Sequence, residues 1–183
     1  MSAAPSTVLV LPGWQDSGPA HWQSLWQAQH PYWRRVQQRD WMLPTRAEWV
    51  GALDAQANAT PGALVLLAHS LGCITVAHWA AQQPAAAARV RHALLVAPPD
   101  VEREDLPSEL ADFAPAPTAA LPFPATLVAS DDDPYCAFGR AAAMADAWGC
   151  ALWNLGAAGH INADAGFGAW PEGLARLEAL CAG

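Results

Sequence analysis

The stretch GALVLLAHSLGCITVAHWAAQ, residues 62–82, sets a serine between an apolar run and an amphipathic run. The first run is short and apolar, which predicts a buried strand, and residues 71–82 have the length and periodicity of a helix. Ser70 falls on the turn between them, and its neighbours two positions away, Ala68 and Gly72, are both small. This pattern is typical of a nucleophile elbow, G-x-S-x-G, with alanine in place of the first glycine. It also fits a plain strand–turn–helix in which the serine caps the helix.

The rest of the chain alternates in the same way between short apolar runs and helical patterns. Strands are expected to begin at Thr7, Gly62, Val90, Pro124 and Cys150, with a weaker candidate near residues 35–39. Helices are expected over residues 19–30, with Ser17 as cap and Pro19 in the first turn, and over residues 45–59, with Thr45 as cap. Further helices are expected over residues 71–82 and 138–148 and within residues 168–183. Residues 100–122 are rich in proline and acidic residues, which predicts a surface excursion with one short helical piece.

Six candidate strands alternating with helices predict a mainly parallel sheet that is covered on both faces. In such sheets ligands bind at the carboxyl ends of the strands. Four of the expected strands end at Pro12, His69, the acidic run at Asp131 and the Gly-rich segment at Gly159. The sequence therefore predicts a functional site along this edge.

Length and composition limit the classes of function. The chain has 183 residues, of which 53% are hydrophobic and 14% charged, and we expect a single domain over residues 1–183. Acidic residues outnumber basic ones, 17 against 9, for a formal charge of −8, and every basic residue is arginine. We therefore expect neither nucleic acid nor a membrane surface as a partner.

The cysteines and the start of the chain indicate the compartment. The cysteines are scattered without C-x-x-C spacing, which indicates reduced thiols rather than a disulfide framework or a zinc site: Cys73, Cys136, Cys150 and Cys181. The first basic residue is Arg34, so the positive start of a signal peptide is lacking, and no apolar run is long enough to span a bilayer. We expect a cytoplasmic protein.

A serine hydroxyl becomes a good nucleophile only when a base takes its proton, and a carboxylate must orient that base. Of the six histidines, His160 alone lies in a Gly-rich loop after the last expected strand. The run ASDDDPYC, residues 129–136, follows another strand and supplies the acid. Asp133 is preferred because the following proline keeps it extended, with Asp131 as the rival and Asp132 less favoured.

The oxyanion hole needs two backbone donors. One is the amide of Leu71, which follows the serine, and the other is expected from the loop after the first strand, at Trp14 or else Gln15. No metal or organic cofactor is required by this chemistry. Candidates for the walls of the substrate pocket are Trp14, Gln15, Phe113, Phe123, Tyr135, Phe138 and Ile161.

Four segments together resemble a known family: LPGWQDSGPAHWQSLW, AHSLGC, ASDDDPYC and GHINADAGFGAWPEG. They look like the small serine hydrolases of the retinoblastoma-binding protein 9 and YdeN group. The resemblance implies a compact α/β-hydrolase fold without a large cap domain, with Ser70 as nucleophile, Asp133 as acid and His160 as base. It also implies activity on small esters or, in some members, amides. The vertebrate relative's L-x-C-x-E partner motif is not matched here, because the corresponding segment ends at Thr75.

We therefore expect a carboxylesterase that cleaves small acyl esters through an acyl-enzyme intermediate. Two alternatives stay open: an amidase or aminopeptidase-like hydrolase with the same three residues, and a binding protein that uses this fold without catalysis.

Overall fold

The computed structural model describes residues 6–182 and contains one six-stranded sheet in which every neighbouring pair is parallel. Along the sheet the strands follow the order β2-β1-β3-β4-β5-β6. Their bounds are β1 Thr7–Leu11, β2 Arg34–Arg35, β3 Leu64–His69, β4 Val90–Val96, β5 Ala125–Ala129 and β6 Ala151–Asn154. The expected α/β architecture is confirmed, and β3, the strand before Ser70, lies near the middle of the sheet.

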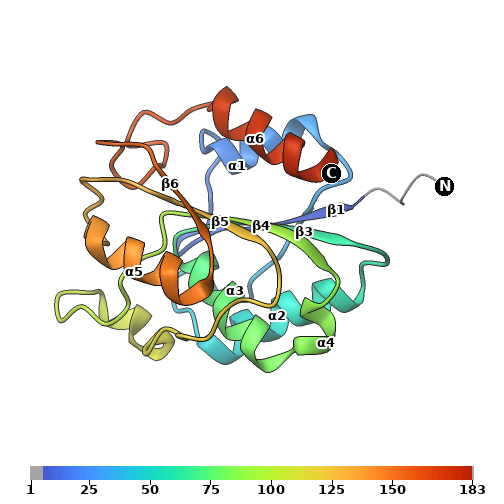
Figure 1. The fold of residues 1–183 in the computed structure, drawn as a ribbon, viewed down its shortest axis with the longest axis horizontal. Coiled ribbons are helices and arrows are strands. Elements are labelled where there is room, and N and C mark those ends of the chain that lie inside the picture. Colours follow the sequence, from blue (N-terminus) through green and yellow to red (C-terminus); the bar gives the residue numbers. More distant parts are fainter. Residues whose placement is uncertain (1–5, 183) are drawn as a thin grey trace.

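Helices cover both faces of the sheet (Figure 1). One face carries α1 (Trp22–Gln29) and α6 (Pro171–Ala182). The other carries α2 (Arg46–Asn58), α3 (Leu71–Gln82), α4 (Pro84–Ala87) and α5 (Phe138–Trp148), and a short 3-10 helix spans Ser108–Phe113. The predicted bounds of α3 and α5 are confirmed.

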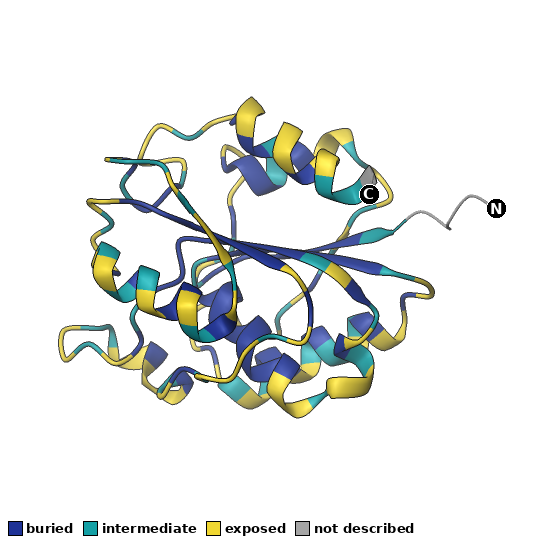
Figure 2. Ribbon diagram, in the orientation of Figure 1, coloured by how far each residue is buried: buried dark blue, intermediate teal, exposed yellow. Residues whose placement is uncertain are grey.

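Each face of the sheet packs a separate hydrophobic cluster, because successive side chains of a strand point to opposite faces. Leu64 and Leu66 belong to the cluster under α2 and α3, whereas Val65 and Leu67 belong to the cluster under α1. All of β3 is buried, as expected for a central strand of a covered parallel sheet (Figure 2). Five of the ten tryptophans are among the largest fully buried side chains: Trp22, Trp26, Trp49, Trp79 and Trp148.

Local signals predicted some helix ends and missed others. Thr45 caps α2 as expected, since its side chain accepts a hydrogen bond from the amide of Glu48. Ser17 does not cap α1: the cap is His21, whose Nδ1 accepts from the amide of Gln23. The hydroxyl of Ser17 donates instead to Gln23 Oε1 at 2.6 Å, so the helix begins later and Pro19 precedes it.

Two segments differ from the prediction. The weak strand expected near residues 35–39 is confined to Arg34–Arg35, because only these two residues pair with β1. Residues 100–122 are not merely a surface excursion, since Leu110 and Phe113 of the 3-10 helix are buried in the core. Apolar side chains thus anchor a segment whose composition resembles an exposed loop.

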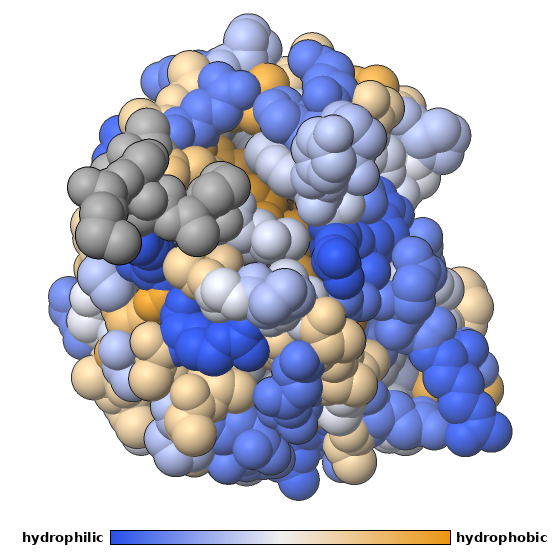
Figure 3. Space-filling model, turned by 90° about the vertical axis from the view of Figure 1, so that its right-hand side faces the viewer, coloured by the Kyte–Doolittle hydropathy of each residue, from blue (hydrophilic) through white to orange (hydrophobic). Residues whose placement is uncertain are grey.

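None of the helices within residues 6–182 is long and apolar enough to cross a bilayer. On the side that faces right in Figure 1, hydrophilic and apolar residues are interspersed over the surface (Figure 3).

Candidate active site

The turn between β3 and α3 holds Ser70 in an unusual backbone conformation. Its φ is 54°, in a region that non-glycine residues rarely adopt. Gly72 lies where the start of α3 passes the end of β1, and a Cβ at this position would lie only 2.5 Å from the carbonyl oxygen of Leu11. The glycine two positions after the serine is therefore required by the close approach of two backbone segments.

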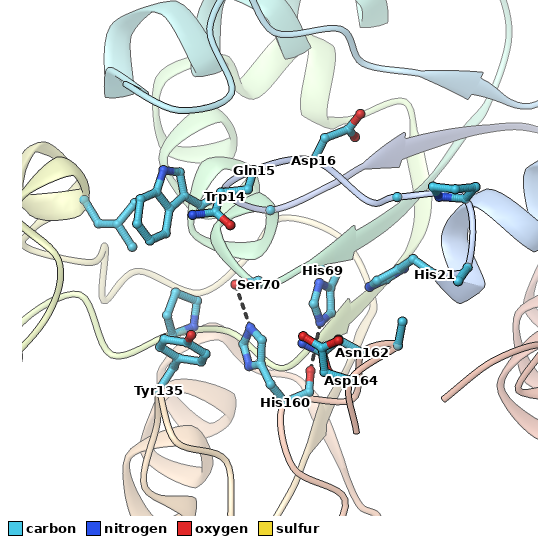
Figure 4. Close-up of a pocket in the computed structure, with 17 residues that line it drawn as sticks. Trp14, Gln15, Asp16, His21, His69, Ser70, Tyr135, His160, Asn162 and Asp164 are labelled. Carbon is cyan, nitrogen blue, oxygen red and sulfur yellow. Dashed lines mark hydrogen bonds between the residues drawn. The ribbon is translucent and has the colours of Figure 1, made fainter. Parts of the chain in front are cut away.

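Three segments distant in sequence meet at this turn. His160 Nε2 lies 2.9 Å from Ser70 Oγ (Figure 4). On the other side of the ring, His160 Nδ1 lies 2.9 and 3.0 Å from the two carboxylate oxygens of Asp133. The side chains of His160 and Asp133 are only 9% and 3% exposed. A carboxylate held against Nδ1 leaves the unprotonated Nε2 to accept the proton of Ser70 Oγ.

Each of the three adjacent aspartates has its own contact. Asp131 Oδ1 accepts from the side-chain amide of Asn154 at 2.8 Å, and Asp132 Oδ1 accepts from the amide of Gly159 at 2.7 Å. The hydrogen bond from Gly159 lowers the pKa of Asp132. Asp133 alone of the three contacts the imidazole, so the geometry favours it over the rival Asp131.

The other histidines apart from His21 and His69 lie away from the serine. His78 is bonded to the carbonyl of Phe113, His92 to the hydroxyl of Thr126, and His30 contacts Glu178. His160 is thus the histidine whose ring nitrogen contacts Ser70 Oγ.

The loop after β1 lies against the serine. A Cβ on Gly13 would lie 2.7 Å from Ser70 Cβ, so only glycine permits this approach. No acceptor for the amide of Trp14 is present among residues 6–182, whereas the amide of Gln15 already donates to the carbonyl of Trp41 at 3.0 Å. The amide of Leu71, the first residue of α3, has no partner within its own helix. Of the two candidates on the loop, Trp14 is therefore the one with a free donor.

Contacts with β2 and with the segment that follows it fix this loop. Gln15 and Asp16 both have positive φ, of 68° and 64°. Arg35 donates to Asp16 Oδ1 at 2.8 Å and to the carbonyl of Ser17 at 3.2 Å. The indole of Trp14 donates to the carbonyl of Met42 at 2.9 Å. These contacts stabilise a strained backbone conformation that the loop would not keep without them.

A pocket of about 400 Å³ opens over Ser70 and His160. Trp14, Gln15 and Tyr135 line it, as expected from the sequence. In Figure 4, Trp14 and Tyr135 lie to one side of Ser70. His21, Asn162 and Asp164 line the opposite side.

Four residues expected in the pocket wall lie elsewhere. Phe113 is fully buried and packs edge-on against Trp49, with ring centroids 5.8 Å apart. Phe123 and Phe138 pack in the same cluster on that face of the sheet, and Ile161 is fully buried in the cluster on the other face. Residue type alone does not distinguish an aromatic side chain in the core from one in a cleft, which is why these predictions are wrong.

Two histidines that the sequence did not indicate, His21 and His69, also line the pocket. Their rings lie 4.7 Å apart, and that of His69 lies 4.9 Å from that of His160. Burial is the main cause that lowers the pKa of His21 to about 4, with Arg35 contributing, and burial holds the pKa of His69 well below its usual range. Both rings are therefore neutral at pH 7.

The His-Trp-Gln block at residues 21–23 is the signal that could have indicated this region. Its glutamine is fully buried, and Gln23 Nε2 donates to the carbonyls of Leu11 and Leu67, at 3.1 and 3.2 Å. One side chain thus connects α1 to the ends of β1 and β3, the two strands that lead to the site. A buried polar residue of this kind is expected only where its hydrogen bonds are satisfied.

Within the described residues, no three histidine, cysteine or acidic side chains are grouped so that they could hold a metal ion. The four cysteines are free thiols, and burial raises the pKa of Cys136 and Cys150 to about 12.

Comparison with known proteins identifies one matching family and several similar structures. The sequence profile of one family, described as Serine hydrolase, matches residues 8–179. The structure of a YdeN-like hydrolase from Pectobacterium atrosepticum is 33% identical, with a TM-score of 0.85 over 97% of this chain and 91% of that one. No curated protein sequence matches the chain.

Two more distant structures share the fold. The ydeN gene product of Bacillus subtilis is 19% identical, with a TM-score of 0.77 over 96% of this chain and 98% of that one. The carboxylesterase CesB of Bacillus subtilis is 16% identical, with a TM-score of 0.62 over 100% of this chain and 86% of that one. The chain is thus similar to compact α/β-hydrolases over nearly its whole length.

Proposed function

The chain belongs to the YdeN-like serine hydrolase family, and from this premise we propose that it is a carboxylesterase in which Ser70 is the nucleophile, His160 the general base and Asp133 the acid that orients the base. The observation that carries the proposal is the unbroken series of contacts from Asp133 through His160 to Ser70 Oγ, each about 3 Å long. The family makes the chain a hydrolase; the bond it cleaves and the role of each residue are the proposal.

The proposed reaction has two halves. His160 Nε2 takes the proton of Ser70 Oγ as the oxygen attacks the ester carbonyl, and the imidazolium is stabilised by Asp133. The amides of Leu71 and Trp14 donate to the oxyanion of the tetrahedral intermediate. His160 then protonates the leaving alcohol, and an acyl group remains on Ser70.

Water completes the second half. His160 takes a proton from the water as it attacks the acyl carbonyl, and Ser70 regains its proton when the acid leaves. No step needs an electron acceptor or a metal. The positive end of α3, which begins directly after Ser70, adds to the stabilisation of negative charge at the oxyanion.

The pocket supports a small acyl substrate. A volume of about 400 Å³ lies near the lower end of the range for small-molecule sites. Apolar and polar side chains both line it, so a short acyl group and a modest leaving group can be accommodated. A peptide or amide is the alternative substrate, because the same three residues serve both bonds.

A substrate panel tests the proposal. We expect turnover of p-nitrophenyl esters with short acyl chains, with a lower kcat/KM for longer chains and for aminoacyl anilides. Ser70→Ala should abolish turnover while the protein stays folded. Faster cleavage of anilides than of esters would overturn the ester assignment. Turnover by Ser70→Ala equal to that of wild type would show that Ser70 is not the nucleophile, and absence of turnover by wild type would favour the binding protein.

Two further properties belong to the same proposal. Free thiols at all four cysteines support a reducing compartment, and we propose the cytoplasm. We also propose that residues 1–183 form one domain, which binds small molecules rather than nucleic acid or membrane.

A further inference from the structure

Two side chains from distant elements bind the backbone next to the proposed base. His69, the last residue of β3, has its Nε2 2.9 Å from the carbonyl oxygen of His160. Trp22, the first residue of α1, donates its indole N–H to the next carbonyl along, that of Ile161, at 2.7 Å. Two successive carbonyls are thus held by donors that lie 91 and 139 positions away in the sequence.

The backbone at this point needs such support. Ile161 has a φ of 48°, a conformation that is strained for a β-branched residue. The two residues before His160 are also held by hydrogen bonds: the amides of Ala158 and Gly159 donate to Ser130 Oγ and Asp132 Oδ1. A strained segment persists only where its surroundings determine it, and here the segment has hydrogen-bond partners both before His160, at Ser130 and Asp132, and at His160 and the residue after it.

The chemistry of the His69 contact is unambiguous. A carbonyl oxygen only accepts hydrogen bonds, so Nε2 of His69 carries a proton and donates it. The ring is buried among His21, Trp22 and His160, with centroids 4.7, 5.7 and 4.9 Å away. Burial lowers the pKa of His69 and keeps it neutral, so the donor is present without a charge beside the base.

We propose that His69 and Trp22, which we call the loop anchors, are positioning residues that hold the His160 ring at hydrogen-bond distance from Ser70 Oγ. Neither anchor touches the reacting atoms in this role; each acts through a backbone carbonyl of the base's own loop. The inference rests on the proposed function, because a position of His160 matters for the rate only if His160 is the base.

Substitutions that remove one N–H while keeping an aromatic ring test the inference, with a control that loses the same ring volume elsewhere. Trp22→Phe keeps an aromatic ring but loses the indole donor, and His69→Phe likewise keeps a ring without a donor. His69→Gln restores an N–H at about the reach of Nε2. The readouts are the rate constant for labelling by a fluorophosphonate probe, kcat and KM for p-nitrophenyl acetate, and the thermal unfolding midpoint.

Trp26→Phe is the matched control. Trp26 lies one turn further along α1, and its indole N–H donates to the carbonyl of Ala169 at 2.6 Å, nine residues beyond His160 in the same loop. The control therefore removes an equally short hydrogen bond between the same helix and the same loop, but far along the loop from the base. It should lower the unfolding midpoint about as much as Trp22→Phe does.

We expect the labelling rate and kcat of Trp22→Phe and His69→Phe to fall by about 10- to 100-fold with KM nearly unchanged, since displacement of a catalytic group by about 1 Å has effects of this size. His69→Gln should recover most of the loss, and Trp26→Phe should label at the wild-type rate. Should His69→Phe not fold, the pair Trp22→Phe and Trp26→Phe decides alone.

The possible failures are distinguishable. Labelling of folded Trp22→Phe and His69→Phe at the wild-type rate would overturn the role of the loop anchors and leave the proposed function intact. Equal losses in Trp22→Phe and Trp26→Phe would also overturn it, because the effect would then follow stability rather than position. Wild-type protein that fails to label at Ser70 would instead refute the proposed function itself.

Discussion

Gly13→Ala is a small substitution at the point where the loop after β1 meets the serine. The added Cβ would lie 2.7 Å from Ser70 Cβ and 3.2 Å from Ser70 Oγ. Carbon atoms in ordinary contact are separated by about 3.5–4.0 Å, so the loop or the serine must move by about 1 Å. Arg35 and Trp41 hold the loop from the other side, so the movement cannot be absorbed without displacing the amide of Trp14.

The expected cost follows from the loss of one oxyanion donor. Removing such a donor costs about 3 kcal/mol of transition-state stabilisation, which is roughly a hundredfold in rate. The assay is kcat/KM for p-nitrophenyl acetate together with the thermal unfolding midpoint. Gly51→Ala is the control, because its Cβ would meet nothing within 4 Å and it lies in α2, outside the site.

We expect Gly13→Ala to lose about a hundredfold in kcat/KM while remaining folded, and Gly51→Ala to retain wild-type turnover. Turnover of folded Gly13→Ala within about threefold of wild type would refute the assignment of the oxyanion donor to this loop, because an effect that small is far below the loss of one donor.

Three further predictions concern the acid, a buried histidine and a helix cap. Asp133→Asn should lower kcat on the order of 10⁴-fold, whereas Asp131→Asn should change it little; the reverse result would show that the wrong aspartate has been assigned. His21 has a pKa of about 4 when folded against 6.5 for the free side chain, so it takes up a proton on unfolding and its contribution to stability falls as pH drops from about 6.5 to 4. Between pH 7 and pH 5 the free energy of unfolding, measured with urea, should therefore fall by about 2 kcal/mol more for wild type than for His21→Asn. This variant retains a cap acceptor for the amide of Gln23. If the free energies of the two proteins changed in parallel with pH, that would argue against a buried neutral ring. Thr45→Ala should lower the free energy of unfolding by about 1 kcal/mol through loss of the cap of α2, and an unchanged urea midpoint would contradict this.

Much of the sheet and its helices could be predicted because their signals are local. The apolar runs of β3 and β4 and the helical periodicity of α3 and α5 depend on residues within one element. The order of strands along the sheet and the burial of Phe113 depend on contacts between distant segments, and no local pattern reports them. The predicted start of α1 was wrong for a related reason, since the hydroxyl of Ser17 donates to the buried side chain of Gln23 and does not cap the helix.

The candidate site divides in the same way. Ser70, Asp133 and His160 could be proposed from chain order and from the ends of strands, and the structure places the ring of His160 within about 3 Å of both Ser70 Oγ and the carboxylate of Asp133. The sequence does not indicate His69, because it adjoins Ser70 and neighbouring side chains on a strand point to opposite faces. The positive φ of Ser70 ends that alternation, and the partner of His69 lies 91 residues away, so its contact with the base loop could be found only in three dimensions.

The central claim is that Ser70 is activated as a nucleophile by His160. The most direct measurement is to treat wild type and His160→Ala with a fluorophosphonate probe and to locate the adduct by peptide mass spectrometry. We expect an adduct on Ser70 in wild type and none in folded His160→Ala. An adduct on a different residue, or equal modification of Ser70 in both proteins, would contradict it.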